Sequence, residues 1–251
     1  MTITLKALCS HLDELLDPGR FKDYCPNGLQ VEGSDTVTRL VTGVTASQAL
    51  LDSAVAWEAD AVLVHHGYFW RGENQRVVGM KRRRLATLLA NDMSLLAYHL
   101  PLDAHPKLGN NARLGQLMGI DTWRPLGDGV DVGSVGELPE VVPAKVLVER
   151  LATLTARQPL HVGDGDQFVQ TVAWCTGAAQ SYIEAAVAAG ADVFITGEAS
   201  EPTVHTAREE GIQFIAAGHH ATERYGVQAL GEHLQKNLGI EHRFIDIDNP
   251  V

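Results

Sequence analysis

The sequence predicts an α/β fold made of two similar α/β domains with mostly parallel sheets. Short apolar segments alternate with segments of helical periodicity along the chain, which is typical of strands joined by helices. One segment, residues 61–64 (Ala-Val-Leu-Val), is an unbroken apolar run, as expected for a strand buried on both faces of a parallel sheet. In addition, the two halves of the chain share residues at fixed offsets, which indicates an internal repeat.

The first half is expected to begin with a helix over residues 4–16, because leucines recur there at helical spacing and Asp17-Pro18-Gly19 ends the pattern. Residues 23–31 are expected to form a turn at Pro-Asn-Gly, followed by the start of a strand. The other elements expected in this half are a strand over 39–45, a helix over 47–58, a strand over 61–65, a helix over 81–91, a strand over 94–98 and a helix over 110–118.

The second half repeats this alternation after Gly127-Asp128-Gly129, the best candidate for a linker. We therefore expect one domain over residues 1–126 and a second over residues 127–251. The elements expected in the second half are a helix over 143–155, a strand over 169–175, a helix over 179–189, a strand over 192–196, a helix over 201–210, a strand over 212–217, a helix over 221–238 and a strand over 241–247.

The repeat is visible at two offsets. At an offset of 132, seven residues between positions 46 and 60 are identical in the second half. At an offset of 120, His99 falls on His219 and Asp103 falls on Glu223. Each half therefore carries a histidine followed four residues later by a carboxylate, after an apolar strand.

Composition excludes several classes of protein. The chain has 251 residues and a formal net charge of −11, which argues against binding nucleic acid or membranes through a basic surface. The four basic residues at 81–84 are interpreted as a solvated helix face. No apolar run approaches the roughly 20 residues of a membrane span, and the first residues lack the pattern of a signal peptide. Three widely spaced cysteines without a CxxC pair make a cysteine zinc site unexpected and favour a cytoplasmic location.

Candidate metal ligands stand where the expected strands end. His65 and His66 close the apolar strand, at the sheet edge where ligands bind in open α/β folds. Asp103, His219 and Glu223 also lie at or just beyond the carboxyl ends of expected strands. Mixed histidine and carboxylate ligands suit zinc, iron, manganese or nickel. Five such ligands are enough for two divalent transition-metal ions about 3.5–4 Å apart.

Other polar residues leave more than one interpretation open. His99 either supports the ligands, which we favour, or is itself a ligand. Glu198, in Thr-Gly-Glu, either orients a ligand or only begins a helix. His220 is expected to be exposed or to cap a helix, and His161 and His233 are expected to have no chemical role. The sequence has no P-loop, and no GxSxG or GxGxxG segment of any weight.

The loop from Gly67 to Gly79 lies where the first half exceeds the second by 12 residues, so we expect an added lid. Tyr68 and Trp70 have flat faces and polar tips that suit stacking on a heterocyclic base. Phe69 is expected to pack under the loop.

Five segments carry a resemblance to a known family. They are Asp-Tyr-Cys-Pro-Asn-Gly-Leu-Gln-Val at 23–31, Val-His-His-Gly-Tyr-Phe-Trp at 64–70, His-Leu-Pro-Leu-Asp-Ala-His at 99–105 with Gly-Asn-Asn at 109–111, Thr-Gly-Glu at 196–198, and Gly-His-His-Ala-Thr-Glu at 218–223. In this order, and over almost the whole chain, they resemble the NIF-three-like family, also called the GTP cyclohydrolase I type-two homologue family. The chain is similar to its short bacterial form, because no extra domain is inserted between the halves.

The resemblance implies two similar α/β domains with a dinuclear metal site in the cleft between them. The ligands it implies are His65, His66, Asp103, His219 and Glu223. It also implies a toroidal homohexamer whose metal sites face the inner cavity.

Two functions are compatible with such a site. The first is a metal-dependent hydrolase acting on a nucleotide or related heterocycle, with GTP ring opening as one candidate reaction. Asp103 or Glu223 would then bridge the ions and His99 would shuttle a proton, while Arg71 and Lys107 are candidates for contacting a substrate phosphate. The second is a non-catalytic metal-binding protein that delivers metal or docks a protein partner.

Overall fold

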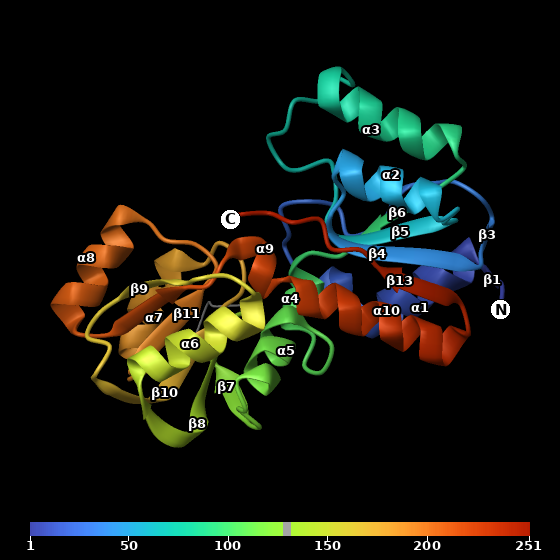
Figure 1. Cartoon of the computed structure of the whole chain (residues 1–251). Coiled ribbons are helices and arrows are strands. Elements are labelled where there is room, and N and C mark those ends of the chain that lie inside the picture. The colour runs from blue at the N-terminus through green and yellow to red at the C-terminus, as the bar shows by residue number, and fades with distance from the viewer. Residues whose placement is uncertain (128–131) are drawn as a thin grey trace. The chain divides into compact units, whose positions relative to one another are not determined.

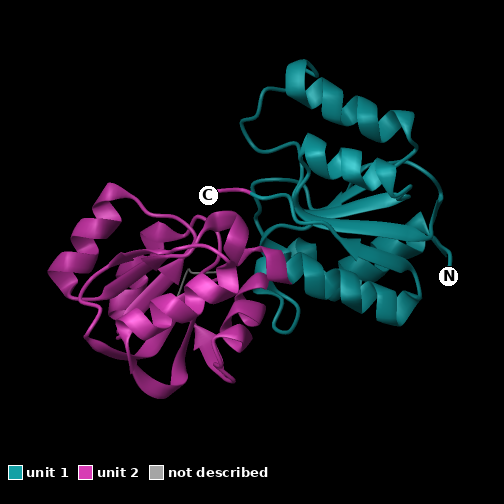
Figure 2. Ribbon diagram, in the orientation of Figure 1, with its two compact units in different colours: residues 1–109, 226–248 teal, residues 110–225, 249–251 magenta. Residues whose placement is uncertain are grey.

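The computed structural model describes residues 1–127 and 132–251, which divide into two compact units (Figures 1 and 2). Unit 1 comprises Met1–Gly109 and Gly226–Asp248, and unit 2 comprises Asn110–Tyr225 and Asn249–Val251. Both units are α/β, as predicted. Their boundaries differ from the expected 1–126 and 127–251, because the chain returns to unit 1 after residue 225. Asp128 and Gly129 of the expected linker lie outside the described residues.

Unit 1 is built on a five-stranded sheet of order β13-β4-β5-β6-β2. Its first four strands run parallel and β2 joins the edge antiparallel, so the predicted parallel sheet is confirmed here. The strands are β2 (Gly28–Val31), β4 (Arg39–Thr45), β5 (Ala61–His66), β6 (Ser94–Ala97) and β13 (Glu241–Phe244), and a separate antiparallel pair is formed by β1 (Ile3–Thr4) and β3 (Thr36–Val37).

Helices cover both faces of this sheet (Figure 1). Because side chains alternate along a strand, Leu63 of β5 packs into one core with leucines of α1 and α10. Val62 and Val64 pack into the other core, with Leu50 of α2 and Leu88 of α3. This two-sided burial is why the strand reads as an unbroken apolar run. The helices are α1 (Leu5–Leu16), the 3-10 helix η1 (Pro18–Arg20), α2 (Gln48–Ala56), α3 (Gly79–Ala90), α4 (Leu100–Ala104) and α10 (Arg224–Leu238).

Unit 2 is built on a mixed six-stranded sheet of order β7-β8-β10-β11-β12-β9. Three of the strand pairings in this sheet are antiparallel, so the expectation of mostly parallel sheets is wrong for unit 2. The strands are β7 (Trp123–Pro125), β8 (Ser134–Pro143), β9 (Leu160–Val162), β10 (Phe168–Trp174), β11 (Val193–Thr196) and β12 (Gln213–Ala216). The helices are α5 (Asn110–Leu117), α6 (Ala144–Thr155), the 3-10 helix η2 (Gln180–Tyr182), α7 (Ile183–Ala188), α8 (Glu201–Glu210) and α9 (His219–Thr222).

Strand β8 escaped prediction because its sequence carries few strand signals. It contains Pro139 and Pro143, and residues 139–141 are exposed in succession, which breaks the alternation of buried and exposed positions. Its pairing with β10 shifts register between Val169 and Thr171, which marks a β-bulge. A proline cannot donate to the ladder, so it is tolerated at such an irregularity.

The parallel strands of the two units are joined in the same way. In unit 1, α2 and α3 connect β4, β5 and β6, and in unit 2, α7 and α8 connect β10, β11 and β12. Asp60 accepts hydrogen bonds of 2.7 and 2.8 Å from the N–H groups of residues 38–39, where β4 begins. Asp192 accepts bonds of 2.8 Å from the N–H groups of residues 170–171 in β10. The two aspartates that match in the sequence therefore hold equivalent positions.

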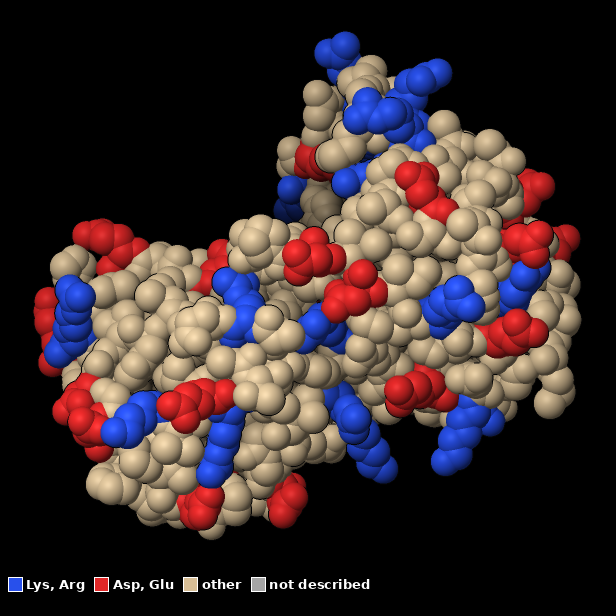
Figure 3. Space-filling model, viewed as in Figure 1, with Lys and Arg blue, Asp and Glu red and all other residues tan. Residues whose placement is uncertain are grey.

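Basic side chains gather on the surface over α3, as the blue atoms in Figure 3 show. Arg82 and Arg83 are exposed, as expected for a solvated face. Lys81 pairs with Glu73 at 3.3 Å, and the Arg84 guanidinium lies over the Tyr68 ring at 6.0 Å. Two of the four cations therefore fasten the preceding loop to the helix. Among the helices of the described part of the chain, none has the length and apolar character needed to cross a membrane.

His242 of β13 predicts a pH dependence of stability. Its Nε2 hydrogen-bonds Thr42 Oγ1 at 2.8 Å, and burial lowers the pKa of this histidine to about 4. The unfolded chain binds a proton at this residue near pH 6.5, whereas the folded chain does not. Stability is therefore lost as the pH falls from about 6.5 towards 4.

We predict that His242→Gln reduces the slope of the free energy of unfolding against pH, in this range, by up to about one proton per molecule. Urea denaturation at several pH values between 4 and 7.5 measures this slope. His205→Gln, which removes an exposed histidine of α8, is the matched control. Equal slopes for wild type and His242→Gln would contradict the prediction.

Candidate functional site

Two adjacent histidines close β5 in unit 1. The His65 and His66 rings lie 4.5 Å apart between centroids, tilted by 42°. Nδ1 of His65 donates to the Tyr98 carbonyl at 3.0 Å, which leaves the Nε2 lone pair directed towards Asp103 Oδ1, 3.5 Å away. Nδ1 of His66 hydrogen-bonds Thr45 Oγ1 at 3.2 Å. Each ring is thus oriented through Nδ1 and presents Nε2, as metal-binding histidines do.

Asp103 lies in the short helix α4, directly after β6 and His99. Its N–H donates to the His99 carbonyl at 3.2 Å, and its side chain is buried. The structure therefore brings together the three residues of unit 1 that the sequence proposed as ligands: His65, His66 and Asp103.

His99 is held beside these residues by the segment 23–31. Asp23 Oδ1 accepts from His99 Nδ1 at 2.7 Å, and Asn27 Oδ1 accepts from the His99 N–H at 2.7 Å. The His99 ring lies 5.0 Å from the His65 ring and 5.6 Å from the His66 ring. The segment 23–31 therefore fixes His99 through two hydrogen bonds. The sequence predicted only a turn and the start of a strand here.

Asp23 is tied to its surroundings through several donors. Besides His99, it accepts from the N–H groups of Tyr24 and Leu100 and from Asn27 Nδ2, at 2.6 to 3.0 Å. Burial alone would raise the pKa of Asp23, but the hydrogen bonds from His99 and Asn27 outweigh it and lower the pKa to about 2. Asp23 is therefore a carboxylate at neutral pH. The sequence shows Asp23 and Asn27 as Asp-x-x-x-Asn. This spacing does not reveal their role, because their partner His99 lies 76 residues away from Asp23.

Two groups of donor atoms in unit 1 have the spacing that a metal ion requires. His65, His66 and His99 form one group, and Asp23, Cys25 and His99 form the other, with ligand atoms within 4.8 Å of one another. Burial and the nearby Asp23 carboxylate raise the pKa of the Cys25 thiol to about 12, which disfavours the thiolate that a metal needs. Of the two groups, the one that contains His65 and His66 is therefore the better candidate for holding a metal ion.

The aromatic loop differs from its expected arrangement. Tyr68 is buried and its hydroxyl donates to the Ala46 carbonyl at 2.8 Å, so this ring is not available to stack on a ligand. Phe69, expected under the loop, is 39% exposed and lies beneath Lys81 Nζ at 5.0 Å. Trp70 lies edge-on to His99, with 5.0 Å between ring centroids. Of the three aromatics, Trp70 is the one that flanks the histidines.

Gln30 fixes the start of this loop. Its Oε1 accepts from the Tyr68 N–H at 2.6 Å. A Cβ atom at Gly67 would lie 2.2 Å from the same oxygen and 2.6 Å from Ala97 Cβ, so only glycine fits at this position. Arg71 donates to the Asp23 carbonyl at 2.9 Å, which occupies one of its guanidinium nitrogens within unit 1.

Unit 2 contributes a histidine between two carboxylates. His219 of α9 donates through Nδ1 to Glu198 Oε1 at 2.7 Å, and its Nε2 lies 3.2 Å from Glu223 Oε2. Burial would lower the pKa of His219, but Glu223 and Glu198 together raise it to about 9. Glu198 therefore orients this imidazole, one of the two roles that the sequence left open.

The helix expected over 221–238 is interrupted at Glu223. Helix α9 ends at Thr222 and α10 begins at Arg224. Thr222 Oγ1 donates to the His219 carbonyl at 3.0 Å and accepts from the Gly177 N–H at 3.1 Å. This break places the Glu223 side chain beside His219.

Two glycines leave room for these side chains. A Cβ atom at Gly177 would lie 2.2 Å from Glu223 Oε1, and one at Gly197 would lie 2.6 Å from His219 Cα. Each glycine follows a threonine just beyond a strand, at Thr176 after β10 and at Thr196 in β11. The repetition of Thr-Gly at 176–177 and 196–197 is the sequence signal that could have indicated these two positions.

The remaining histidines of the sequence analysis have structural contacts. His220 is buried, not exposed, and its N–H donates to the Val251 carbonyl at 3.0 Å. His161 hydrogen-bonds Gln213 Oε1 at 2.8 Å, and His233 hydrogen-bonds His11 at 3.1 Å between Nε2 atoms.

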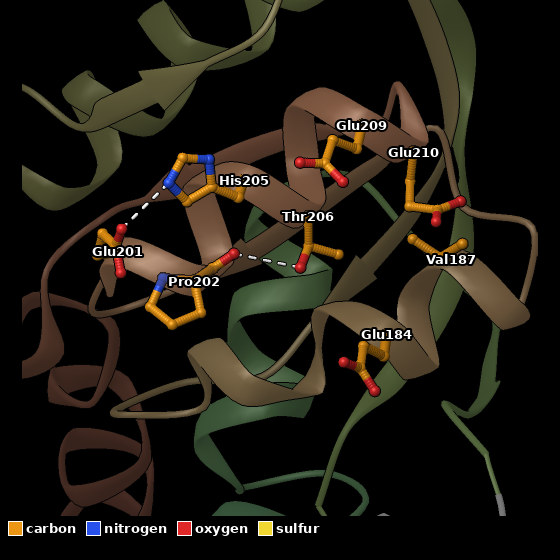
Figure 4. A pocket seen from close by; sticks show the side chains of 8 residues that line it. All are labelled: Glu184, Val187, Glu201, Pro202, His205, Thr206, Glu209 and Glu210. Atoms are coloured by element: carbon orange, nitrogen blue, oxygen red, sulfur yellow. Dashed lines mark hydrogen bonds and ion pairs between the residues drawn. The ribbon is translucent and has the colours of Figure 1, made fainter.

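A groove of about 500 Å³ in unit 2 lies between α7 and α8 (Figure 4). Four glutamates line it, and His205 of α8 pairs with one of them, Glu201, at 3.1 Å. The carboxylates Glu184, Glu209 and Glu210 are spread along two helices. This acidic groove is therefore separate from His219 of α9 and from Glu223, neither of which lines it.

The raised pKa of His219 predicts that metal-free protein carries a proton on this ring at neutral pH. A metal ion has to displace this proton, so metal affinity falls as the pH is lowered below about 9. We predict that Glu198→Gln shifts the titration midpoint of His219 to lower pH, because one of the two carboxylates that stabilise the imidazolium is removed. Nuclear magnetic resonance titration of the ring protons in chelator-treated protein measures the midpoint. A wild-type midpoint near 6.5 would contradict the prediction.

Comparison with known proteins identifies the family. A family model described as Duf34/NIF3 (NGG1p interacting factor 3) matches residues 3–250. A Pseudomonas aeruginosa protein named GTP cyclohydrolase 1 type 2 homolog is 58% identical over 253 residues, covering 100% of both chains. The Escherichia coli K12 protein of the same name is 55% identical over 241 residues, 96% of each chain. A solved structure described as protein ybgI, of unknown function, has a TM-score of 0.95 and 53% identity, covering 99% of this chain and 100% of the other. The resemblance seen in the motifs is confirmed, and the chain belongs to the Duf34/NIF3 family.

Proposed function

We propose that the protein binds two divalent transition-metal ions and uses them to hydrolyse a nucleotide or a related heterocyclic small molecule. One observation carries this proposal. In each unit a histidine is oriented through Nδ1, and its Nε2 lies beside a carboxylate: His65 is 3.5 Å from Asp103, and His219 is 3.2 Å from Glu223. Imidazole and carboxylate together form a donor set that suits zinc, iron, manganese or nickel.

The proposed ligands are His65, His66, Asp103, His219 and Glu223. The proposal includes a dinuclear site in the cleft between the two domains, as the family resemblance implies. The chemistry of the donors supports it, because the hydrogen bonds to Tyr98 and Glu198 already fix the ring orientation that metal-binding histidines need.

The hydrolytic part of the proposal is supported by the arrangement around His99. Bound divalent metal ions would supply Lewis acidity for the attack of water. Asp23 holds His99 through Nδ1, so Nε2 of this ring is the atom that can accept a proton from the attacking water and return it to the leaving group. Trp70, edge-on to His99, would exclude bulk water and offer a flat face to a heterocyclic base. The name of the relatives, GTP cyclohydrolase 1 type 2 homolog, points to the same class of substrate.

We further propose that the chain forms a homohexamer in the cytoplasm and that its halves derive from an internal repeat. The family resemblance supports the hexamer. The three cysteines are thiols, which supports a reducing compartment. The equivalent hydrogen bonds of Asp60 and Asp192 support the repeat.

We predict about two transition-metal ions per chain in protein purified from metal-supplemented cultures. His65→Ala and Gly177→Ala should both lose metal, the first by removing a donor and the second by displacing the Glu223 carboxylate. Elemental analysis measures the metal, and circular dichroism checks the fold. His161→Gln should keep its metal, because the hydrogen bond that His161 makes is to Gln213 in β12, which is not a proposed ligand. Wild-type protein without metal would remove the basis of the proposal.

We predict that metal-loaded protein turns over GTP or a related nucleotide in a chromatographic screen, and that Glu223→Gln abolishes the turnover. His99→Gln should keep the metal but lower kcat by about 10²–10⁴-fold, the usual contribution of a positioned acid or base. Full metal content without turnover of any nucleotide would favour the non-catalytic metal-binding protein.

A further inference from the structure

We propose that unit 2 contains a subsite for an anionic group of the substrate, a phosphate or a carboxylate, with Arg157 as its recognition residue. The proposal rests on the proposed function, since it assigns part of the same substrate. The subsite is a groove of about 450 Å³, here called the Arg157 groove, within the range of sites that hold small molecules. Its walls include Arg157, Pro159, Leu160, Gly197, Glu198 and Val251.

Arg157 is placed in this groove by the end of α6. The helix ends at Thr155, and Ala156 adopts the left-handed conformation with φ of 54°, which turns the chain sharply. The Arg157 N–H then donates to the Ala152 carbonyl at 3.2 Å. Its guanidinium is consequently directed to the segment where β12 passes into α9.

The guanidinium lies directly against Gly218. A Cβ atom at this glycine would lie 2.4 Å from Arg157 Nη1 and 2.7 Å from Arg157 Cδ. Gly218 also has a φ of 103°, which disfavours any other residue. Gly218, which directly precedes the proposed ligand His219, therefore makes room for the Arg157 side chain. This contact links the Arg157 groove to the start of α9.

Nη1 of Arg157 is buried and has no hydrogen-bond partner within residues 1–127 and 132–251. A buried charged donor without an acceptor costs folding free energy, so its presence in a native protein calls for an explanation, and a bound ligand is one. A guanidinium offers a planar fork of donors that matches the oxygens of phosphate and carboxylate. The missing acceptor therefore has the chemistry of an oxyanion.

Glu198 lines the same groove and accepts from His219 Nδ1 at 2.7 Å. A ligand seated on Arg157 thus extends to the carboxylate that orients a proposed metal ligand. Because Glu198 repels anions and accepts hydrogen bonds, the anionic group belongs at the Arg157 end and hydroxyl or N–H donors belong at the Glu198 end. A nucleotide carries both kinds of group, an anionic phosphate and hydroxyl donors on its sugar.

Arg71 was one of the two sequence-based candidates for contacting a phosphate, together with Lys107, and the contacts of Arg71 make it less suitable. One of its nitrogens donates to the Asp23 carbonyl, and its guanidinium lies over the Tyr24 ring at 5.9 Å. Arg157 has no such bond at Nη1 within the described residues.

The test compares full-length, metal-loaded wild type, Arg157→Gln and Arg157→Lys by isothermal titration calorimetry with inorganic phosphate, succinate and GMP. We expect Arg157→Gln to bind the preferred anion at least about tenfold more weakly, and Arg157→Lys to recover only part of the affinity, because lysine lacks the fork. Arg150→Gln is the matched control, since Arg150 projects from α6, the helix that precedes Arg157, and pairs with Glu140 at the surface. The probe whose affinity falls more in Arg157→Gln, phosphate or succinate, shows whether the subsite prefers a phosphate or a carboxylate. Equal affinities of wild type and Arg157→Gln for all three probes would overturn the proposal. That result would mean that the anions bind to the metal ions and not to Arg157.

Stability separates a ligand-binding arginine from a structural one. Arg157→Gln should melt at or above the wild-type temperature in the absence of anions, because it removes a buried charge without an acceptor. A marked loss of stability would assign Arg157 to the fold and overturn the subsite. Metal content and the Glu223→Gln control report on the proposed function separately. If nucleotide turnover is absent while phosphate affinity still depends on Arg157, the subsite stands and the hydrolase fails.

Discussion

The orientation of imidazole rings is the constraint on which the rest of the site depends. Each candidate histidine uses Nδ1 for a hydrogen bond within the protein and so presents Nε2 in a fixed direction. The Nδ1 partners are the Tyr98 carbonyl for His65, the Thr45 hydroxyl for His66, the Asp23 carboxylate for His99 and the Glu198 carboxylate for His219. Thr45, Tyr98 and Glu198 lie at or just beyond the ends of β4, β6 and β11, whereas Asp23 lies in the loop that precedes β2.

Close packing of the backbone is the condition that allows this arrangement. Gly67, Gly177 and Gly197 each stand where a Cβ atom would collide with a residue of the site or its support. Gly177 also has a φ of 73°, which other residues adopt only with strain. Conformational freedom is given up at these positions so that the carboxylate of Glu223 and the ring of His219 can lie directly above the strand ends.

Much of the fold of unit 1 and several candidate site residues could be predicted from local sequence. The apolar run of β5 predicted a buried strand, and the two histidines predicted a candidate site at its end, because both signals are contained in six adjacent residues. The role of Asp23 could not be predicted, because its partner His99 is distant in the chain and becomes a neighbour only when β2 pairs with β6. The burial of Tyr68 depends on the Ala46 carbonyl in the same way. Strand β8 was missed because its proline and exposed positions obscure the alternation that marks a strand.

The discontinuity of unit 1 has a consequence for how the chain folds during synthesis. Strand β13 pairs with β4, and α10 covers the core over Leu63, yet both are made after all of β4 to β12. A nascent chain ending near Tyr225 therefore holds every proposed metal ligand, while the face of the first sheet that α10 covers is still open to water. All strands of the unit 2 sheet have been made by then, so unit 2 can fold as a unit before unit 1 is complete. Closure of unit 1, and with it the final burial of β5 beneath α10, waits for residues 226–248 to leave the ribosome.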